Sequence, residues 1–183
     1  MYDAIVVGAR CAGATTAMQL ARAGLDVLLV DRASFPSDVM STHFVHPRGG
    51  AKLQEWGLLD RLRDTGVPPI RSTTFDIGPA AVTGTADPVN GVADWFCPRR
   101  TILDQLLVEA AADAGCDVRT DTAVVDLIWD RGRVTGARLR SGSQPADEHA
   151  RIVVGADGMR STVARLTEAP TYRAVPPMIG VFY

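Results

Sequence analysis

The sequence has little lysine and little cysteine, and both shortages exclude kinds of protein. Lys52 is its single lysine, and lysine and arginine together number 19 against 21 acidic residues. The net charge of −2 gives no basic excess of the kind that binds nucleic acid or an anionic membrane. Cys11, Cys97 and Cys116 are odd in number and form no C-x-x-C pair. We therefore expect no nucleic-acid partner, no disulfide framework and no metal site.

Long hydrophobic runs are absent too. No apolar stretch approaches the roughly 20 residues that a membrane-spanning helix needs. The first apolar run is short and has no basic segment before it, so it does not read as a signal peptide. We expect a cytoplasmic protein without a membrane span. Hydrophobic residues still make up 46% of the 183 residues, enough for one domain with a sizeable core.

The first 32 residues contain the strongest pattern in the chain. Residues 4–7 form an unbroken apolar run, typical of a buried central strand. A glycine-containing turn follows, then a helical stretch over residues 14–23 and a second apolar run at 27–30 that ends in Asp31. Strand, glycine turn, helix, strand and acid predict a βαβ unit that binds a dinucleotide.

Each part of this unit has a physical role in binding. Gly8 lets the chain turn sharply, and Gly13 lets the helix pack close to the sheet. The helix N-terminus offers free N–H groups and a partial positive charge to a pyrophosphate. Asp31 is placed to accept hydrogen bonds from a ribose. Arg10 occupies the second glycine position of the motif, where its guanidinium can contact phosphate. The predicted contacts are Gly8, Ala9, Arg10, Cys11, Ala12, Gly13, Asp31 and Arg32.

The middle of the chain changes character twice. A polar segment with two prolines, from residue 33, predicts a long loop. Residues 70–97 predict two or three antiparallel strands outside the parallel sheet. The remaining expected elements are helices at 48–56, 58–65, 101–114 and 160–166, a strand at 116–120 returning to the parallel sheet, a hairpin of 122–129 with 133–139, a loop at 142–148, a buried strand at 151–154, and a strand beginning at 178.

A second constellation lies in the last third of the chain. The apolar run at 151–154 leads into a glycine-rich turn that holds Asp157 and Gly158, at the strand end where open α/β sheets bind ligands. Arg100 comes just before a helix, within reach of a phosphate or ribose. The alternatives are that Arg100 is a solvated surface residue and that Asp157 only caps the last helix.

Three features, in this order along the chain, carry a resemblance to a known family: the βαβ unit, Arg100 before its helix, and the turn with Asp157 and Gly158. They resemble flavoprotein monooxygenases of the p-hydroxybenzoate hydroxylase type and their relatives, the geranylgeranyl reductases and flavin-dependent halogenases. The resemblance implies an α/β, Rossmann-like FAD-binding fold of the glutathione-reductase type with a small inserted antiparallel β segment. It assigns residues 1–69 and 98–171 to the FAD-binding domain. Residues 70–97 and 172–183 would be strands of an incomplete substrate-side β-sheet.

The resemblance also implies cofactors and contacts. FAD is the expected cofactor, with NAD(P)H as its transient reductant. The first motif and Asp31 would take the ADP part, Arg100 would be a cofactor contact, and the backbone at Val124 would edge the adenine. Asp157 and Gly158 would serve FAD and nicotinamide use. His43 and Arg48 lie in the loop that the family places near the flavin ring, on the side of a small-molecule substrate.

The leading hypothesis is the FAD-binding portion of an NAD(P)H-dependent aromatic-type monooxygenase. The family's third motif would lie beyond residue 183, which leaves three alternatives open. One is a catalytically silent FAD-binding module that self-associates or pairs with a partner chain through 70–97 and 172–183. The others are an FAD-dependent double-bond reductase and an NAD-dependent dehydrogenase, and the Asp157-Gly158 pair argues against the last.

Overall fold

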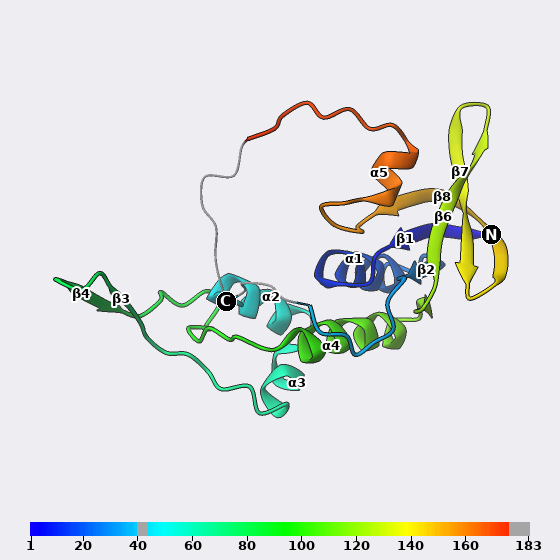
Figure 1. The fold of residues 1–183 in the computed structure, drawn as a ribbon. Coiled ribbons are helices and arrows are strands. Elements are labelled where there is room, and N and C mark those ends of the chain that lie inside the picture. The colour runs from blue at the N-terminus through cyan, green and yellow to red at the C-terminus, as the bar shows by residue number, and fades with distance from the viewer. Residues whose placement is uncertain (40–43, 176–183) are drawn as a thin grey trace.

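A computed structural model describes residues 1–39 and 44–175. In these ranges the chain forms five helices and eight strands (Figure 1). In chain order they are β1 (Tyr2–Val7), α1 (Cys11–Arg22), β2 (Val27–Val30), α2 (Pro47–Glu55), α3 (Leu59–Asp64), β3 (Thr73–Asp76), β4 (Ala81–Gly84), α4 (Arg100–Asp113), β5 (Asp117–Arg119), β6 (Ala123–Asp130), β7 (Arg133–Ser141), β8 (Gln144–Gly155) and α5 (Thr162–Leu166). The strand expected from residue 178 lies outside the described residues.

The main sheet has six strands in the order β5-β2-β1-β8-β7-β6. β5, β2, β1 and the second half of β8 run parallel, whereas β6, β7 and β8 pair antiparallel. β8 therefore belongs to both parts. The parallel part confirms the predicted βαβ unit and the predicted return of the chain after α4.

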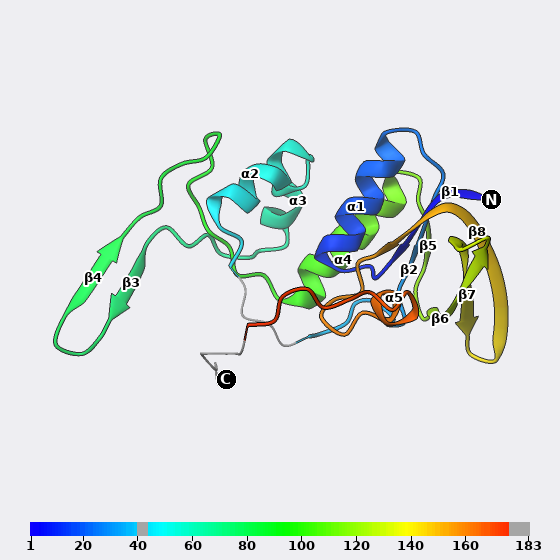
Figure 2. The same cartoon turned by 90° about the horizontal axis from the view of Figure 1, so that it is seen from above.

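Two apolar layers cover the two faces of the parallel strands. α1 and α4 lie on one face, and the β6–β7 hairpin folds over the other (Figure 2). Alternate residues of each strand pack into the apolar layers on the two faces of the sheet. Val6 and Leu29 pack with the helices, whereas Ile5 and Leu28 pack with Leu127 of β6 and with β7. Burial on both faces explains why residues 4–7 of β1 and all of β2 are continuous apolar runs rather than alternating ones.

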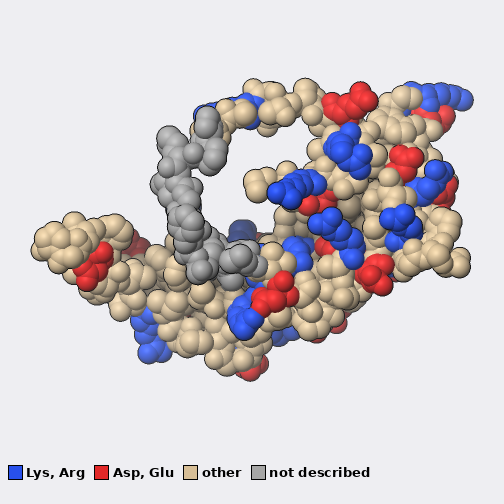
Figure 3. Space-filling model, viewed as in Figure 1, with Lys and Arg blue, Asp and Glu red and all other residues tan. Residues whose placement is uncertain are grey.

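β3 and β4 form a separate two-stranded antiparallel sheet. This confirms the prediction of antiparallel strands outside the main sheet. The hairpin projects away from the α/β body and exposes Phe75, Ile77 and Val82 (Figures 1 and 2). In Figure 3 its surface is mostly uncharged, whereas acidic and basic side chains are interspersed over the body.

Two predictions near the end of the chain are wrong. Residues 142–148 are not a loop: only Gly142 and Ser143 form a turn, and β8 begins at Gln144. The expected burial of residues 151–154 is also wrong: residues 151 and 152 are exposed, Ile152 by 56%, and residues 153 and 154 are only partly buried. Ile152 pairs with Ala4 on the helix-covered face, and the helices of the described residues do not cover it.

A polar network joins three strands of the main sheet. The Tyr2 hydroxyl of β1 donates to Asp117 Oδ2 of β5 at 2.5 Å. Arg119 donates to Asp117 Oδ2 at 2.8 Å, to the Tyr2 hydroxyl at 2.9 Å and to Glu148 Oε1 of β8 at 2.6 Å. Burial and the hydrogen bond to Asp117 raise the pKa of Tyr2 from 10.0 to about 12.

This network predicts a loss of stability in alkali. The unfolded chain releases the Tyr2 proton near pH 10, whereas the folded chain holds it to about pH 12. The free energy of unfolding therefore falls as pH rises through that window. Urea unfolding at a series of pH values should show this fall in the wild type and a weaker one in Tyr2→Phe. Tyr172→Phe, at a 98% exposed tyrosine, is the control and should behave like the wild type. Equal slopes in all three proteins would contradict the assignment.

Candidate functional site

A cleft of about 480 Å³ opens at the carboxyl ends of β1, β2 and β8, beside the N-terminus of α1. This is the edge at which open α/β sheets bind ligands. The cleft gathers residues more than 150 positions apart in the chain. Those that line it are Val7, Gly8, Arg10, Cys11, Ala12, Val30, Asp31, Arg32, Ala33, Val39, Arg100, Thr122, Ala123, Val124, Ala156, Asp157, Gly158, Arg160 and Thr162.

The glycine turn brings α1 close to the strands. Gly8 has a φ of +100°, a conformation that favours glycine, and its N–H donates to Val30 O at 2.8 Å. A Cβ on Gly13 would lie 1.6 Å from Gly8 O, so only glycine fits there. Ala9 and Gly13 are buried behind the turn rather than in the cleft lining.

The N-terminus of α1 faces the cleft with its backbone donors. This 12-residue helix has no side-chain cap and no acidic residue in its first turn. Its first N–H groups have no partner within the helix. Cys11 and Ala12, which supply two of them, line the cleft. Such an end fits an anionic group such as a pyrophosphate.

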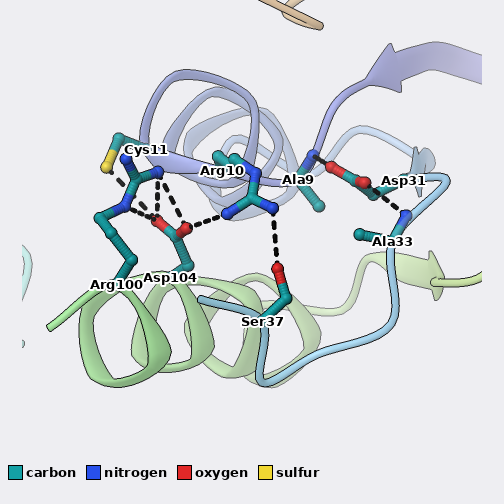
Figure 4. Close-up of polar contacts among 8 residues, drawn as sticks. All are labelled: Ala9, Arg10, Cys11, Asp31, Ala33, Ser37, Arg100 and Asp104. Atoms are coloured by element: carbon teal, nitrogen blue, oxygen red, sulfur yellow. Dashed lines mark hydrogen bonds and ion pairs between the residues drawn. The ribbon is translucent and has the colours of Figure 1, made fainter. Parts of the chain in front are cut away.

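Asp31 ends β2 at the cleft and is 8% exposed. Its Oδ2 accepts the Ala9 N–H at 2.8 Å, and its Oδ1 accepts the Ala33 N–H at 2.8 Å (Figure 4). A carboxylate has about four acceptor positions, so each oxygen keeps capacity for a ligand hydroxyl. Asp31 thus both shapes the turn and fits the ribose role predicted for it.

Arg10, Arg100 and Asp104 form an ion-pair cluster at one end of the cleft (Figure 4). Asp104 is completely buried and accepts hydrogen bonds from Arg10 Nη1 at 2.6 Å and from Arg100 Nη2 at 2.8 Å. The Cys11 thiol lies 3.6 Å from Asp104 Oδ1. Burial and this carboxylate raise the pKa of Cys11, so its thiol stays protonated at neutral pH.

The second motif contributes Asp157 and Gly158 to the cleft lining. The Asp157 side chain points to its own helix: Oδ1 accepts the Ser161 hydroxyl at 2.6 Å, and Oδ2 accepts the Thr162 N–H at 2.6 Å. These contacts show Asp157 in the helix-capping role, which is one of the two roles that the sequence allows for it. Gly158, with a φ of +83°, lets the chain turn along the cleft.

Most other predicted contacts also reach the cleft. Arg32, Arg100 and Val124 line it, whereas Arg48 is exposed at the start of α2 and is not part of the lining. His43 lies outside the described residues. Sequence reasoning missed Thr122, whose N–H donates to Asp31 O at 2.8 Å. Its position just after β5, at the carboxyl edge of the parallel sheet, is the signal that would have found it.

Among residues 1–39 and 44–175, no three His, Cys, Asp or Glu side chains are grouped so that they could hold a metal ion. In the same ranges, no helix combines the length and apolar character needed to span a bilayer.

Comparison with known proteins identifies the class. The family described as an FAD binding domain matches residues 1–175, so the chain belongs to that family and its cofactor is FAD. The fold is a Rossmann-like FAD-binding fold with a mixed sheet. The uncapped N-terminus of α1 and the glycine turn beside it fit the diphosphate of this cofactor, and the free acceptor capacity of Asp31 fits a ribose.

The chain is similar to known proteins of several kinds. The chain is 34% identical over 171 residues to digeranylgeranylglycerophospholipid reductase 2 of Methanothermobacter thermautotrophicus, covering 90% of this chain and 41% of the reductase. It is 32% identical over 178 residues to the rifampicin monooxygenase of Rhodococcus hoagii, covering 95% and 35%. The structure of a myxobacterial chondrochloren halogenase superposes with a TM-score of 0.77 at 27% identity, covering 87% and 38%. The chain thus spans about two fifths of the length of such proteins.

Removing the Asp31 carboxylate should weaken FAD binding. Asp31→Ala takes away a predicted ribose acceptor and leaves the Ala9 and Ala33 N–H groups without their partner. We expect a loss of about 1–3 kcal/mol in binding free energy. Titration of the purified protein with FAD, followed by flavin fluorescence, measures it. Asp126→Ala, at an acid of β6 outside the cleft lining, is the control and should bind as the wild type does. Unchanged affinity in Asp31→Ala would remove Asp31 from the site.

Proposed function

We propose that the chain is the FAD-binding portion of an NAD(P)H-dependent oxidoreductase of the aromatic monooxygenase type. The observation that carries the proposal is the cleft, where an uncapped helix N-terminus and the buried carboxylate of Asp31 lie at the same strand ends. A diphosphate needs the first feature, and a ribose needs the second. A fold of the glutathione-reductase type, with β3 and β4 as an insertion, belongs to the same proposal.

Different residues of the cleft hold different parts of FAD. The N–H groups of Cys11 and Ala12 receive the diphosphate, and Asp31 receives the adenosine ribose. Arg100 lies at the far end of the same lining, and the backbone at Val124 borders the adenine. Gly8 and Gly13 act by being small, since they let the backbone and the helix approach.

Bound FAD would supply the redox chemistry: two electrons from NAD(P)H would reduce O2, with one oxygen atom entering a small-molecule substrate and the other leaving as water. The protein groups position it and do not need to be nucleophiles or acids themselves. The protonated thiol of Cys11 agrees with such a role, since it offers no thiolate at neutral pH. His43 and Arg48, predicted near the substrate, remain part of this proposal.

A double-bond reductase is the second candidate. The specific observation in its favour is the 34% identity to digeranylgeranylglycerophospholipid reductase 2, which slightly exceeds the 32% identity to the rifampicin monooxygenase. Both activities use the same FAD frame. The two candidates differ in the final electron acceptor, which is oxygen in one and a carbon–carbon double bond in the other.

The domain assignment and the partner surface are further parts of the proposal. Residues 1–69 and 98–171 form the FAD-binding domain, and 70–97 and 172–183 contribute to a substrate-side sheet. Phe75 and Val82 face each other across β3 and β4 and are 74% and 70% exposed. Apolar side chains on an open-edged hairpin favour pairing with further strands of the full protein, a second copy or a partner chain.

An absorbance spectrum and a cofactor titration test the proposed function. The purified chain should carry flavin bands or take up added FAD with quenching of flavin fluorescence. NAD in place of FAD should not saturate the cleft, and uptake of NAD alone would favour a nicotinamide-dependent dehydrogenase. If FAD is bound, NAD(P)H oxidation is then measured with and without an aromatic or a polyprenyl substrate. The substrate that accelerates oxidation separates the monooxygenase from the reductase.

A further inference from the structure

Arg10 connects three walls of the cleft. It stands in the glycine turn, where the dinucleotide motif has its second glycine, it lines the cleft, and its guanidinium points toward Asp104 and Ser37 (Figure 4). Nη1 donates to Asp104 Oδ2 of α4 at 2.6 Å, and Nη2 donates to Ser37 Oγ at 2.8 Å. Its guanidinium carbon also lies 5.6 Å from the centre of the Phe35 ring. The glycine turn, α4 and the segment after β2 therefore all contact the Arg10 side chain.

The contact between Arg10 and α4 is held in place because its acceptor, Asp104, is buried. Asp104 is completely buried, and it accepts hydrogen bonds from Arg100 Nε at 3.0 Å and Nη2 at 2.8 Å as well as from Arg10. A buried carboxylate is stable only with such partners, and losing one is costly. The position of Arg10 therefore depends on α4, and the orientation of Arg100 depends on the carboxylate that both arginines share.

The segment of residues 33–39, the wall segment, forms one side of the cleft. Ala33 and Val39 line the cleft, and the Ala33 N–H is held by Asp31. Arg10 holds the segment at Ser37, and Arg99, just before α4, pairs with Asp38. Phe35 packs against the main core beside the Arg10 guanidinium. Arg10 thus keeps the wall segment at a set distance from the glycine turn.

We propose that Arg10 is a positioning residue for FAD, which holds the wall segment against α4 and so slows release of the cofactor. This inference rests on the proposed function, because it concerns the same cleft. It differs from direct phosphate binding by Arg10, since two of the guanidinium nitrogens are already used by Asp104 and Ser37. It also explains why a residue other than glycine serves at this position of the turn.

The decisive variant restores the glycine of the motif. If Arg10 only interrupts the motif, Arg10→Gly should hold FAD at least as well as the wild type. If Arg10 positions the wall segment, FAD should leave Arg10→Gly about tenfold faster, as expected on losing charge-assisted hydrogen bonds. Release is followed by stopped-flow fluorescence after mixing FAD-loaded protein with an excess of the apo form of a tightly FAD-binding flavoenzyme, which captures the released FAD. Arg22→Ala, an arginine of α1 that contacts Trp56 O, is the control and should release FAD at the wild-type rate.

A second variant separates positioning from direct contact and from misfolding. Ser37→Ala leaves the arginine and its contact with Phe35 in place but removes its hydrogen bond to the wall segment, so it should speed release severalfold. The double variant Arg10→Gly with Ser37→Ala should be no faster than Arg10→Gly alone. Direct phosphate binding instead predicts no effect of Ser37→Ala and a weaker dependence of affinity on ionic strength in Arg10→Gly.

The outcomes are distinguishable. Faster release in both single variants without additivity supports the inference. Wild-type release in Arg10→Gly, or release unchanged in Ser37→Ala together with a lost salt dependence, overturns it and leaves the FAD-binding proposal standing. A wild-type chain that takes up no FAD overturns both.

Discussion

Gly13→Val should leave the chain largely unfolded and unable to take up FAD. A Cβ at this position would lie 1.6 Å from Gly8 O and 3.2 Å from the Ala156 side chain. Backbone cannot yield as a flexible side chain does, so α1 would have to move off the strands. We expect a loss of about 3 kcal/mol or more in the free energy of unfolding. Thermal unfolding by circular dichroism and FAD titration measure the two effects.

The control for this variant is Gly84→Val in β4. A Cβ on Gly84 meets nothing within 4 Å, and the hairpin lies away from the cleft. This variant should unfold and bind as the wild type does. A stable Gly13→Val protein that still takes up FAD would mean that α1 packs against the strands differently from the contact described above.

Asp104→Ala should cause the second large loss in the free energy of unfolding. The carboxylate is completely buried and neutralises the guanidinium groups of Arg10 and Arg100, whose side chains are 28% and 14% exposed. Removing it leaves two like charges close together without their shared partner. Breaking a buried pair in this way costs about 3–5 kcal/mol. Urea unfolding of the cofactor-free protein measures the loss without any contribution from FAD.

Two further variants on α4 sharpen this test. Asp104→Asn keeps the shape and one acceptor oxygen but not the charge, so its stability should lie between those of the wild type and Asp104→Ala. Glu109→Ala removes a half-exposed acid that contacts Arg61 at 3.3 Å, and surface pairs of this kind contribute about 0–1 kcal/mol. A loss in Asp104→Ala no larger than in Glu109→Ala would contradict the role given to the buried carboxylate.

The parallel half of the fold could be predicted because its signal is local. β1 and β2 are short apolar runs, α1 is a helix between them, and Gly24 follows it with a φ of +85°. Such features depend on neighbours within a few positions of the chain. The expected elements therefore agree with the structure to within a few residues, as for the strand expected at 4–7 and found at Tyr2–Val7.

β8 could not be predicted in full because its first half has no buried face. Residues 144–148 include no large apolar side chain, and most are exposed. Their strand conformation comes from pairing with β7, including Arg138 Nε, which donates to Asp147 Oδ1 at 2.9 Å. Pro145 is tolerated because this end of β8 extends past β1, which leaves its other edge unpaired. Tertiary pairing, rather than hydrophobic pattern, decides such a strand.

The candidate site was predictable where one motif contains it. The spacing from Gly8 to Asp31 brings both to the cleft, as expected of a βαβ unit. The contact of Arg10 with Asp104 joins residues 94 positions apart and has no local signal. The same holds for Asp157, whose side chain was free to serve either a ligand or the first turn of α5, and only the structure shows the capping contacts.

The central position of β1 has a consequence for how the chain folds. One edge of β1 pairs with β2, about two dozen residues away, but its other edge pairs with β8, as in Tyr2 with Ala150. During synthesis, β1, α1 and β2 emerge early, while the second edge of β1, with its apolar residues 4–7, stays open until β8 leaves the ribosome. Closing so long a loop is slow, and an open apolar edge pairs with other chains. Recovery of native protein should therefore depend steeply on chain concentration and on chaperones that shield this edge.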